Sequence, residues 1–263
     1  MKLKDKIVIV TASTRGIGLA ITEMCAREGA VVYMAARNLE RGEKEAARLR
    51  REGLRVQCVY HDASVISSYT TMAEEVAGKE GRIDVLVNNF GTSDPKRDLD
   101  LAHTDLDVFI DTLTLNLRSV FMGSKSVLPY MKDGGSIINI SSVGGIVPDV
   151  SQIAYGTSKA AINYLTKLIA VHEAKHHIRC NAVLPGMTAT EAVEGHLSEY
   201  FRTLFLKHVP LDRMALPEEI AAAVVYFASD ASAYTTGQIL TISGGFGLAT
   251  PVYGDLRDQQ SKR

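Results

Sequence analysis

The 263-residue sequence is poor in cysteine and contains no long apolar run. Its three cysteines, Cys25, Cys58 and Cys180, form no CxxC pair and accompany no histidine cluster, so neither a disulfide framework nor a metal site is predicted. No stretch of 18 apolar residues occurs, which argues against a transmembrane helix. A net charge of −1 gives no bulk attraction to nucleic acid or an anionic membrane.

Two further absences concern location. The apolar run near the N-terminus, within "KIVIVTA", is too short for the hydrophobic part of a signal peptide. Unpaired thiols are typical of a reducing compartment. We therefore expect a cytoplasmic protein.

Short β-branched runs alternate with longer amphipathic segments along the whole chain. Strands are predicted over 6–12, 31–36, 54–60, 83–89, 135–141, 178–185 and 237–243. Helices are predicted over 16–30, 38–53, 66–81, 150–176, 217–230 and within 101–132. Continuous apolar strands separated by helices indicate a seven-stranded parallel sheet covered on both faces. The expected fold is α/β, a doubly wound Rossmann fold in one domain spanning 1–263, with a mobile polar tail at about 254–263.

The turn "TASTRGIG" (11–18) lies between the first predicted strand and helix. Glycines at 16 and 18 permit a sharp turn and a close approach to a pyrophosphate, which the helix N-terminus also attracts. Arg37, rather than a carboxylate, ends the second strand, and Arg15 lies in the turn. Guanidinium groups suit phosphate oxygens, so NADP is predicted in preference to NAD. The alternative is that both arginines are solvated surface charges.

Tyr155 and Lys159 are four residues apart, which places them on one face of a predicted helix. An ammonium near a phenol is expected to lower the pKa of the phenol from its ordinary value of about 10 towards neutrality, where acid–base catalysis is efficient. Ser142, just after the fifth strand, is positioned to bind a substrate oxygen, with Ser141 as the rival position. Asn116 could hold a water beside Lys159 and relay protons.

These motifs resemble the short-chain dehydrogenase/reductase family over nearly the whole chain. TGxxxGxG is matched except at Ala12, NNAG appears as "NNFG" with Phe90, and PGxxxT matches residues 185–190. The resemblance implies the catalytic residues Asn116, Ser142, Tyr155 and Lys159. It also implies cofactor contacts at Thr11, Ser13, Thr14, Arg15, Gly16, Ile17, Gly18, Arg37, Asn38, Asp62, Ala63, Asn89, Gly91, Tyr155, Lys159, Pro185, Gly186, Thr188 and Thr190.

The family builds its substrate pocket from segments that here span 143–152, 187–211 and 244–254. Predicted substrate contacts are Ser142, Tyr155, Ile146 and Val193, and further apolar walls are expected from Val147, Leu197, Phe201, Phe205 and Tyr253. Candidate partners for a substrate carboxylate are His196, Arg202, Lys207 and His208, although a plain surface role is the simpler interpretation.

Several stretches, "HHIRCNAVLPG", "HVPLDR" and "GGFGLATPVYG", resemble bacterial NADP-dependent hydroxysteroid dehydrogenases of bile acids, particularly the clostridial 7α type. This implies reversible oxidation of a steroid secondary alcohol to a ketone, with positions 12 and 3 as alternatives to 7α. The other hypotheses are a 3-ketoacyl thioester reductase, a non-catalytic NADP(H) sensor and a sugar or polyol dehydrogenase, the last disfavoured by the apolar pocket residues. The family resemblance also implies a homotetramer built through the helices near 104–130 and 150–176.

Overall fold

The computed structural model describes residues 1–132, 134–195, 197–250 and 252–260. Its centre is one sheet of seven parallel strands in the order β3-β2-β1-β4-β5-β6-β7. The single α/β domain and the doubly wound topology are therefore confirmed. The strands are β1 (Ile7–Thr11), β2 (Val31–Ala36), β3 (Val56–Tyr60), β4 (Val85–Asn88), β5 (Gly135–Ile140), β6 (Ile178–Pro185) and β7 (Ile239–Ile242).

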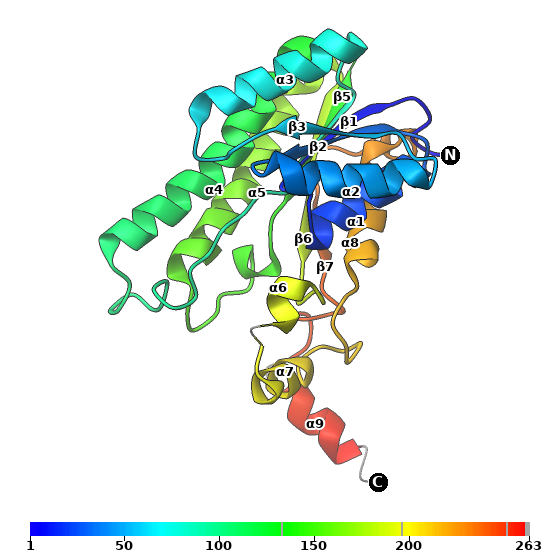
Figure 1. The fold of residues 1–263 in the computed structure, drawn as a ribbon. Helices are drawn as coiled ribbons and strands as arrows, with labels where there is room; N and C mark the ends of the chain where they lie inside the picture. Colours follow the sequence, from blue (N-terminus) through cyan, green and yellow to red (C-terminus); the bar gives the residue numbers. More distant parts are fainter. Residues whose placement is uncertain (133, 196, 251, 261–263) are drawn as a thin grey trace.

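Helices cover both faces of the sheet (Figure 1). Alternate strand residues face opposite sides, so Val8 and Val10 pack with one helix layer and Ile7 and Ile9 with the other. The first layer contains α1 (Gly16–Arg27), α2 (Leu39–Arg51) and α8 (Pro217–Ala228). The second contains α3 (Ile66–Glu80), α4 (Leu106–Val127) and α5 (Ile153–Glu173). Short 3₁₀ turns are η1 (Leu128–Tyr130), η2 (Val143–Gly145), η3 (Ala174–His176) and η4 (Asp230–Ser232).

The predicted helix ends follow from local chemistry. Gly29 and Gly53 adopt positive φ angles of 92° and 82° just after α1 and α2, where a residue with a Cβ would be strained. Pro217 begins α8, the position where its missing N–H costs nothing. These turns return the chain to the sheet, so each strand ends at the same edge.

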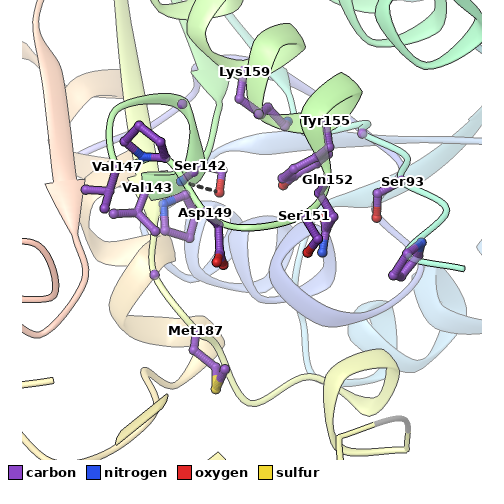
Figure 2. Close-up of a pocket in the computed structure, with 18 of the residues that line it drawn as sticks. Ser93, Ser142, Val143, Val147, Asp149, Ser151, Gln152, Tyr155, Lys159 and Met187 are labelled. Atoms are coloured by element: carbon purple, nitrogen blue, oxygen red, sulfur yellow. Dashed lines mark hydrogen bonds between the residues drawn. The ribbon is translucent and has the colours of Figure 1, made fainter. Parts of the chain in front are cut away.

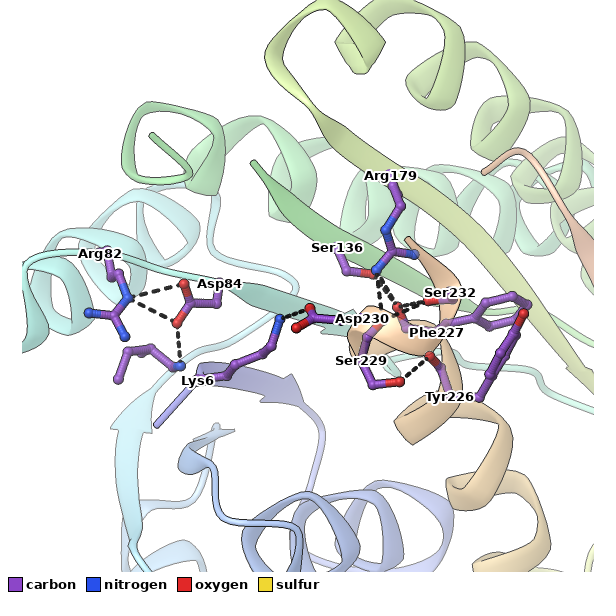
Figure 3. A network of polar contacts seen from close by, with 11 residues as sticks. Lys6, Arg82, Asp84, Ser136, Arg179, Tyr226, Phe227, Ser229, Asp230 and Ser232 are labelled. Carbon is purple, nitrogen blue, oxygen red and sulfur yellow. Dashed lines mark hydrogen bonds and ion pairs between the residues drawn. The ribbon is translucent and has the colours of Figure 1, made fainter. Parts of the chain in front are cut away.

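The opposite edge of the sheet is closed by polar contacts (Figure 3). The carbonyl of Phe227, near the end of α8, accepts hydrogen bonds from the Arg179 guanidinium (2.8 Å), the Ser136 hydroxyl (2.8 Å) and the Ser232 hydroxyl (2.9 Å). Lys6 pairs with Asp230 at 2.7 Å. This network fastens the end of α8 to the amino edge of the sheet.

Three short helices lie beyond the carboxyl edge of the sheet: α6 (Glu191–Glu194), α7 (Glu199–Leu206) and α9 (Tyr253–Gln260) (Figure 1). Residues 254–260 of the segment predicted to be a mobile polar tail are helical and belong to α9. The ammonium of Lys207, just after α7, pairs with Asp255 (2.7 Å) and Asp258 (3.3 Å) of this helix. These ion pairs connect α9 to the end of α7. Residues 261–263 lie outside the described residues.

Within the described ranges, no helix is both long and apolar enough to cross a membrane. The same ranges contain no group of three or more His, Cys, Asp or Glu side chains arranged to hold a metal ion.

Candidate active site

Tyr155 and Lys159 lie in the first two turns of α5, one above the other as the spacing predicts. The Lys159 Nζ is 5.5 Å from the centroid of the Tyr155 ring and donates a hydrogen bond to the carbonyl of Ile140 at 3.0 Å. Lys159 is 3% exposed, whereas Tyr155 is partly exposed and lines a cavity. A Cβ at Gly91 would lie 2.9 Å from the Lys159 Nζ, so this glycine gives the ammonium room.

Burial controls the titration of both groups. Burial lowers the pKa of Lys159 to about 8, because a charged ammonium loses hydration. Burial raises the pKa of Tyr155 above its usual value, and the nearby Ser142 hydroxyl acts in the opposite direction. The net shift of the Tyr155 pKa is therefore upward in this structure rather than towards neutrality. The Lys159 ammonium donates to the Ile140 carbonyl rather than to the phenol oxygen, and desolvation is the largest influence on the phenol.

The structure distinguishes Ser142 from Ser141. The Ser141 side chain is buried and its hydroxyl donates to the Lys159 carbonyl at 3.1 Å. The Ser142 hydroxyl accepts the N–H of Gly144 at 3.1 Å, and Figure 2 shows it facing the phenol oxygen of Tyr155. Of the two serines, Ser142 is the one placed to share a substrate oxygen with Tyr155.

Asn116 is fully buried in α4, and its side-chain amide is used within the protein. Its Nδ2 donates to the Thr92 carbonyl and to the Ser158 hydroxyl, both at 2.9 Å, and its Oδ1 accepts the Thr92 N–H at 2.9 Å. The amide therefore joins the segment after β4 to α5. The Oδ1 accepts one of the two hydrogen bonds that an amide oxygen can take, and the role of Asn116 in holding a water stays a prediction.

A cavity of about 1400 Å³ opens at the carboxyl edge of the sheet. It contains Ser142, Tyr155 and Lys159 together with the predicted residues Ile17, Asn89, Gly91, Ile146, Pro185, Gly186, Thr188, Thr190 and Val193. Of the predicted apolar walls, Val147, Leu197, Phe201 and Phe205 line it. Tyr253 does not belong to this lining; it begins α9 instead.

Two aromatic rings form part of the cavity wall. Phe205 and Phe246 stack with centroids 4.6 Å apart and planes 16° apart. Phe246 was not predicted by name, because a single phenylalanine in a glycine-rich segment carries no periodic signal. Asp98 was missed as well; its carboxylate accepts the N–H of Tyr155 across 57 residues of sequence.

The turn after β1 fits a pyrophosphate. Gly16 has a φ of 51°, and a Cβ at Gly18 would lie 2.5 Å from both the Ala12 carbonyl oxygen and the Asn89 Nδ2. The Ser13 Oγ is buried and has no partner within the described residues. A cradle with no space for a Cβ and an unused buried hydroxyl suits a close phosphate oxygen. The other predicted turn residues, Thr11 and Thr14, lie in the same segment.

Ala12 adopts a φ of 51°, a left-handed conformation that costs a residue with a Cβ about 1–2 kcal/mol. Alanine therefore forms this turn, but with strain. We predict that Ala12→Gly raises the free energy of unfolding by about 1 kcal/mol and the melting temperature by about 2–4 °C. Thermal unfolding of the purified variant measures this.

Ala222 supplies the matched control, because it is exposed in the interior of α8 with ordinary helical geometry. Ala222→Gly should lower stability by about 1 kcal/mol. A decrease in melting temperature for both variants would show that position 12 is not strained.

The two arginines follow neighbouring strands at the same edge. Arg15 is the N-cap of α1, Arg37 follows β2, and both are exposed. Within the described residues neither guanidinium has a hydrogen bond or an ion pair, but the charge of Arg37 acts on the nearby Asp62 carboxylate. The pKa of Asp62 is lowered mainly by the Ser64 hydroxyl, with the charge of Arg37 contributing. Asn38 caps α2 through the N–H of Arg41 at 2.8 Å, and Ala63 is buried beside Asp62.

The segment after β6 is ordered by threonines. The Thr188 hydroxyl donates to the Gly186 carbonyl at 3.0 Å, and the Thr190 hydroxyl caps α6 by accepting the Val193 N–H at 3.3 Å. A Cβ at Gly16 would touch the Thr190 methyl group at 3.2 Å. The end of the PGxxxT segment therefore lies against the glycine turn.

A glycine turn at the first strand of a parallel sheet, beside a tyrosine and lysine one helical turn apart, defines a nicotinamide-dependent oxidoreductase. Comparison with known proteins agrees: a family model described as enoyl-(acyl carrier protein) reductase matches residues 11–247. The chain belongs to the short-chain dehydrogenase/reductase family. Members of this family act on small molecules with a nicotinamide cofactor.

Individual relatives are similar over nearly their full length. The chain is 48% identical over 256 residues to a 7α-hydroxysteroid dehydrogenase of Clostridium sardiniense, covering 97% of this chain and 98% of the relative. It is 48% identical over 257 residues to one of Paraclostridium sordellii, covering 97% and 96%. A solved short-chain dehydrogenase/reductase from Mycobacterium marinum has a TM-score of 0.88 and 32% identity, covering 94% of this chain and 98% of that one.

Proposed function

We propose that this protein is an NADP-dependent hydroxysteroid dehydrogenase that reversibly oxidises the 7α-hydroxyl of a bile acid to a ketone. The observation that carries the proposal is that Ser142, Tyr155 and Lys159 line a large cavity together with many apolar side chains. The 48% identity to two proteins named for this activity supports the choice of substrate.

The shape and chemistry of the cavity support a flat, rigid and apolar substrate. Its volume of about 1400 Å³ exceeds that of an ordinary single-ligand site, so it has room for the nicotinamide and a steroid nucleus together. The stacked rings of Phe205 and Phe246 give one wall a flat aromatic surface. Ile146 and Val193 add aliphatic surface near the reacting groups.

Among the candidates for a substrate carboxylate, His208 alone lines the cavity within the described residues. The Lys207 ammonium is already paired with Asp255 and Asp258, and Arg202 is exposed outside the lining. His196 lies outside the described residues. A carboxylate at the far end of the steroid would therefore meet His208 or solvent.

NADP is proposed as the cofactor because two exposed guanidinium groups, those of Arg15 and Arg37, follow β1 and β2 at one edge of the sheet, and no carboxylate ends β2. Three segments would hold the cofactor. The β1–α1 turn offers the unused Ser13 hydroxyl, the segment after β3 offers Asp62 and Ala63, and the segment after β4 offers Asn89 and Gly91. When bound, the nicotinamide supplies the hydride acceptor.

The chain's own residues handle the proton. Ser142 and Tyr155 hold the substrate hydroxyl, and Tyr155 as phenolate removes its proton while the carbon loses hydride. Since burial raises the pKa of Tyr155, the phenolate needs added positive charge, which Lys159 and an oxidised nicotinamide would provide. Asn116 orders the Thr92 segment against α5 beside this group.

Assembly and location are also proposed from the family resemblance, as a cytoplasmic homotetramer. The outer faces of α4 and α5 support it, because they expose large apolar side chains at Leu106, Ile110, Phe121, Tyr164 and Val171. The mass of the purified protein in solution measures this.

The substrate assignment is tested with bile acids that differ by one hydroxyl. Chenodeoxycholate carries 3α- and 7α-hydroxyls, lithocholate only the 3α, and deoxycholate the 3α and 12α. Of these three bile acids, we expect only chenodeoxycholate to support reduction of NADP⁺. Reduction of NAD⁺ with the same substrate should be weaker. Turnover of lithocholate would indicate position 3, and turnover of deoxycholate without lithocholate would indicate position 12. A 3-ketoacyl thioester as the sole substrate, or NADP(H) binding without turnover of any alcohol or ketone, would replace the proposal.

A further inference from the structure

The helix that carries Tyr155 is held at its N-terminus by a carboxylate from a remote segment. The N–H groups of Ala154 and Tyr155 donate to the two carboxylate oxygens of Asp98, each at 2.9 Å. Asp98 lies between β4 and α4 and is completely buried. The first N–H groups of a helix have no partners within it, so Asp98 supplies partners from 56 and 57 residues away.

The backbone of the same segment extends the contact. The N–H of Gln152 donates to the Asp98 carbonyl at 3.1 Å, and the N–H of Ile153 to the Leu99 carbonyl at 3.2 Å. The four consecutive N–H groups of residues 152–155 therefore all donate to acceptors on Asp98 or Leu99. Gln152 is held at a φ of 62°, which a non-glycine residue adopts only when its surroundings fix it.

The charge of Asp98 is balanced by the helix rather than by a cation. No salt bridge reaches Asp98 within the part of the chain that the structure describes, whereas a carboxylate at a helix N-terminus is favoured by the helix dipole. A buried carboxylate is costly unless its oxygens are satisfied, and both oxygens here face the first turn of α5. Moving the Tyr155 backbone would leave that charge without its partners.

We propose that Asp98 is the positioning residue for Tyr155, which fixes the phenol oxygen relative to Ser142 and the substrate. Asn116 holds Thr92 against Ser158, so the segment between Thr92 and Leu99 is attached to α5 at both of its ends. An error of about 1 Å in a reacting group costs up to about a hundredfold in rate, which makes such attachment important for turnover.

The test is Asp98→Asn, which preserves the shape but replaces one acceptor by an amide donor that faces an N–H. We expect kcat to fall by about tenfold or more, in keeping with displaced acid–base catalysis, while the Kd for NADPH stays within about twofold. Hydrogen exchange at the amides of residues 153–156 should become faster. Asp98→Ala, with both acceptors removed, should lower kcat further.

Asp84 provides the matched control (Figure 3). Its carboxylate also accepts a remote backbone N–H, that of Ile7 at 2.7 Å, but at the edge of the sheet opposite to the cavity. Asp84→Asn should lower the melting temperature and leave kcat within about twofold of the wild type. If Asp98→Asn does not fold, Asp98→Glu keeps the charge and both oxygens, and its longer side chain should lower kcat by displacing the helix start.

The positioning role of Asp98 rests on the proposed reaction, but the two proposals can be contradicted independently. If the wild type does not oxidise a bile acid, the substrate proposal fails, and the Asp98 and Asp84 variants are compared on whichever secondary alcohol or ketone it does convert. A kcat for Asp98→Asn equal to that of Asp84→Asn, or a loss of NADPH affinity as large as the loss of kcat, would overturn the positioning role.

Discussion

Tyr155→Phe should lower kcat for steroid oxidation by about 10²–10⁴, the usual contribution of one general acid–base group. The ring and its packing in α5 remain, so the fold should be unchanged and only the proton acceptor is lost. Affinity for NADPH should fall by no more than about tenfold, the upper worth of one hydrogen bond. Steady-state kinetics and a fluorescence titration of the cofactor measure the two effects.

Tyr164 is the control for this substitution. It lies nine residues further along α5, on the face proposed for assembly and outside the cavity lining, so Tyr164→Phe makes the same chemical change away from the reacting groups and keeps the apolar ring. This variant should keep wild-type kcat. Turnover by Tyr155→Phe at a comparable rate would show that another group accepts the proton.

Lys159→Met should abolish turnover and also change how stability depends on pH. The pKa of Lys159 is about 8 in the folded protein and about 10.5 when unfolded, so between these values the unfolded state binds more protons. The contribution of Lys159 to stability is therefore present above about pH 10.5 and lost as the pH falls through 8. Between pH 7 and pH 10.5, the free energy of unfolding of the wild type should therefore increase by about 3 kcal/mol relative to that of Lys159→Met.

The quantity to compare is the difference in free energy of unfolding between wild type and Lys159→Met at each pH. This difference cancels the contribution of the Cys25 and Cys58 thiols, whose pKa values are raised by burial and which also titrate in alkali. Denaturant unfolding at a series of pH values gives that difference. Lys167, exposed on the same helix, is the control; Lys167→Met should stay within about 0.5 kcal/mol of the wild type and keep its activity. A pH-independent gap between wild type and Lys159→Met would contradict the buried ammonium.

The fold could be predicted because its signals are local. Each strand is a continuous apolar run, and Gly29, Gly53 and Pro217 punctuate the helices at positions where their backbone preferences apply. The pairing of Tyr155 with Lys159 was equally accessible, since spacing on a helix fixes which residues share a face. Ser142 followed from its place at the carboxyl end of β5.

What escaped prediction depends on contacts between distant segments. Nothing in the spacing of Asp98 shows that its carboxylate meets the N-terminus of α5, and the partners of the Asn116 amide are equally remote. The direction of the Tyr155 pKa shift depends on how deeply the phenol is buried, which a sequence does not show. The ion pair between Lys207 and Asp255 likewise joins residues 48 apart in the sequence, so the spacing of the polar tail does not reveal it.

The central claim is that hydride leaves a steroid carbon held at Tyr155 and Ser142. Chenodeoxycholate carrying deuterium at C7 in place of the hydrogen tests it most directly, with mass spectrometry of the NADPH formed. We predict that the NADPH carries the deuterium and that the steroid product is the 7-ketone without it. NADPH that contains no deuterium, or deuterium that remains in the steroid after turnover, would contradict the account.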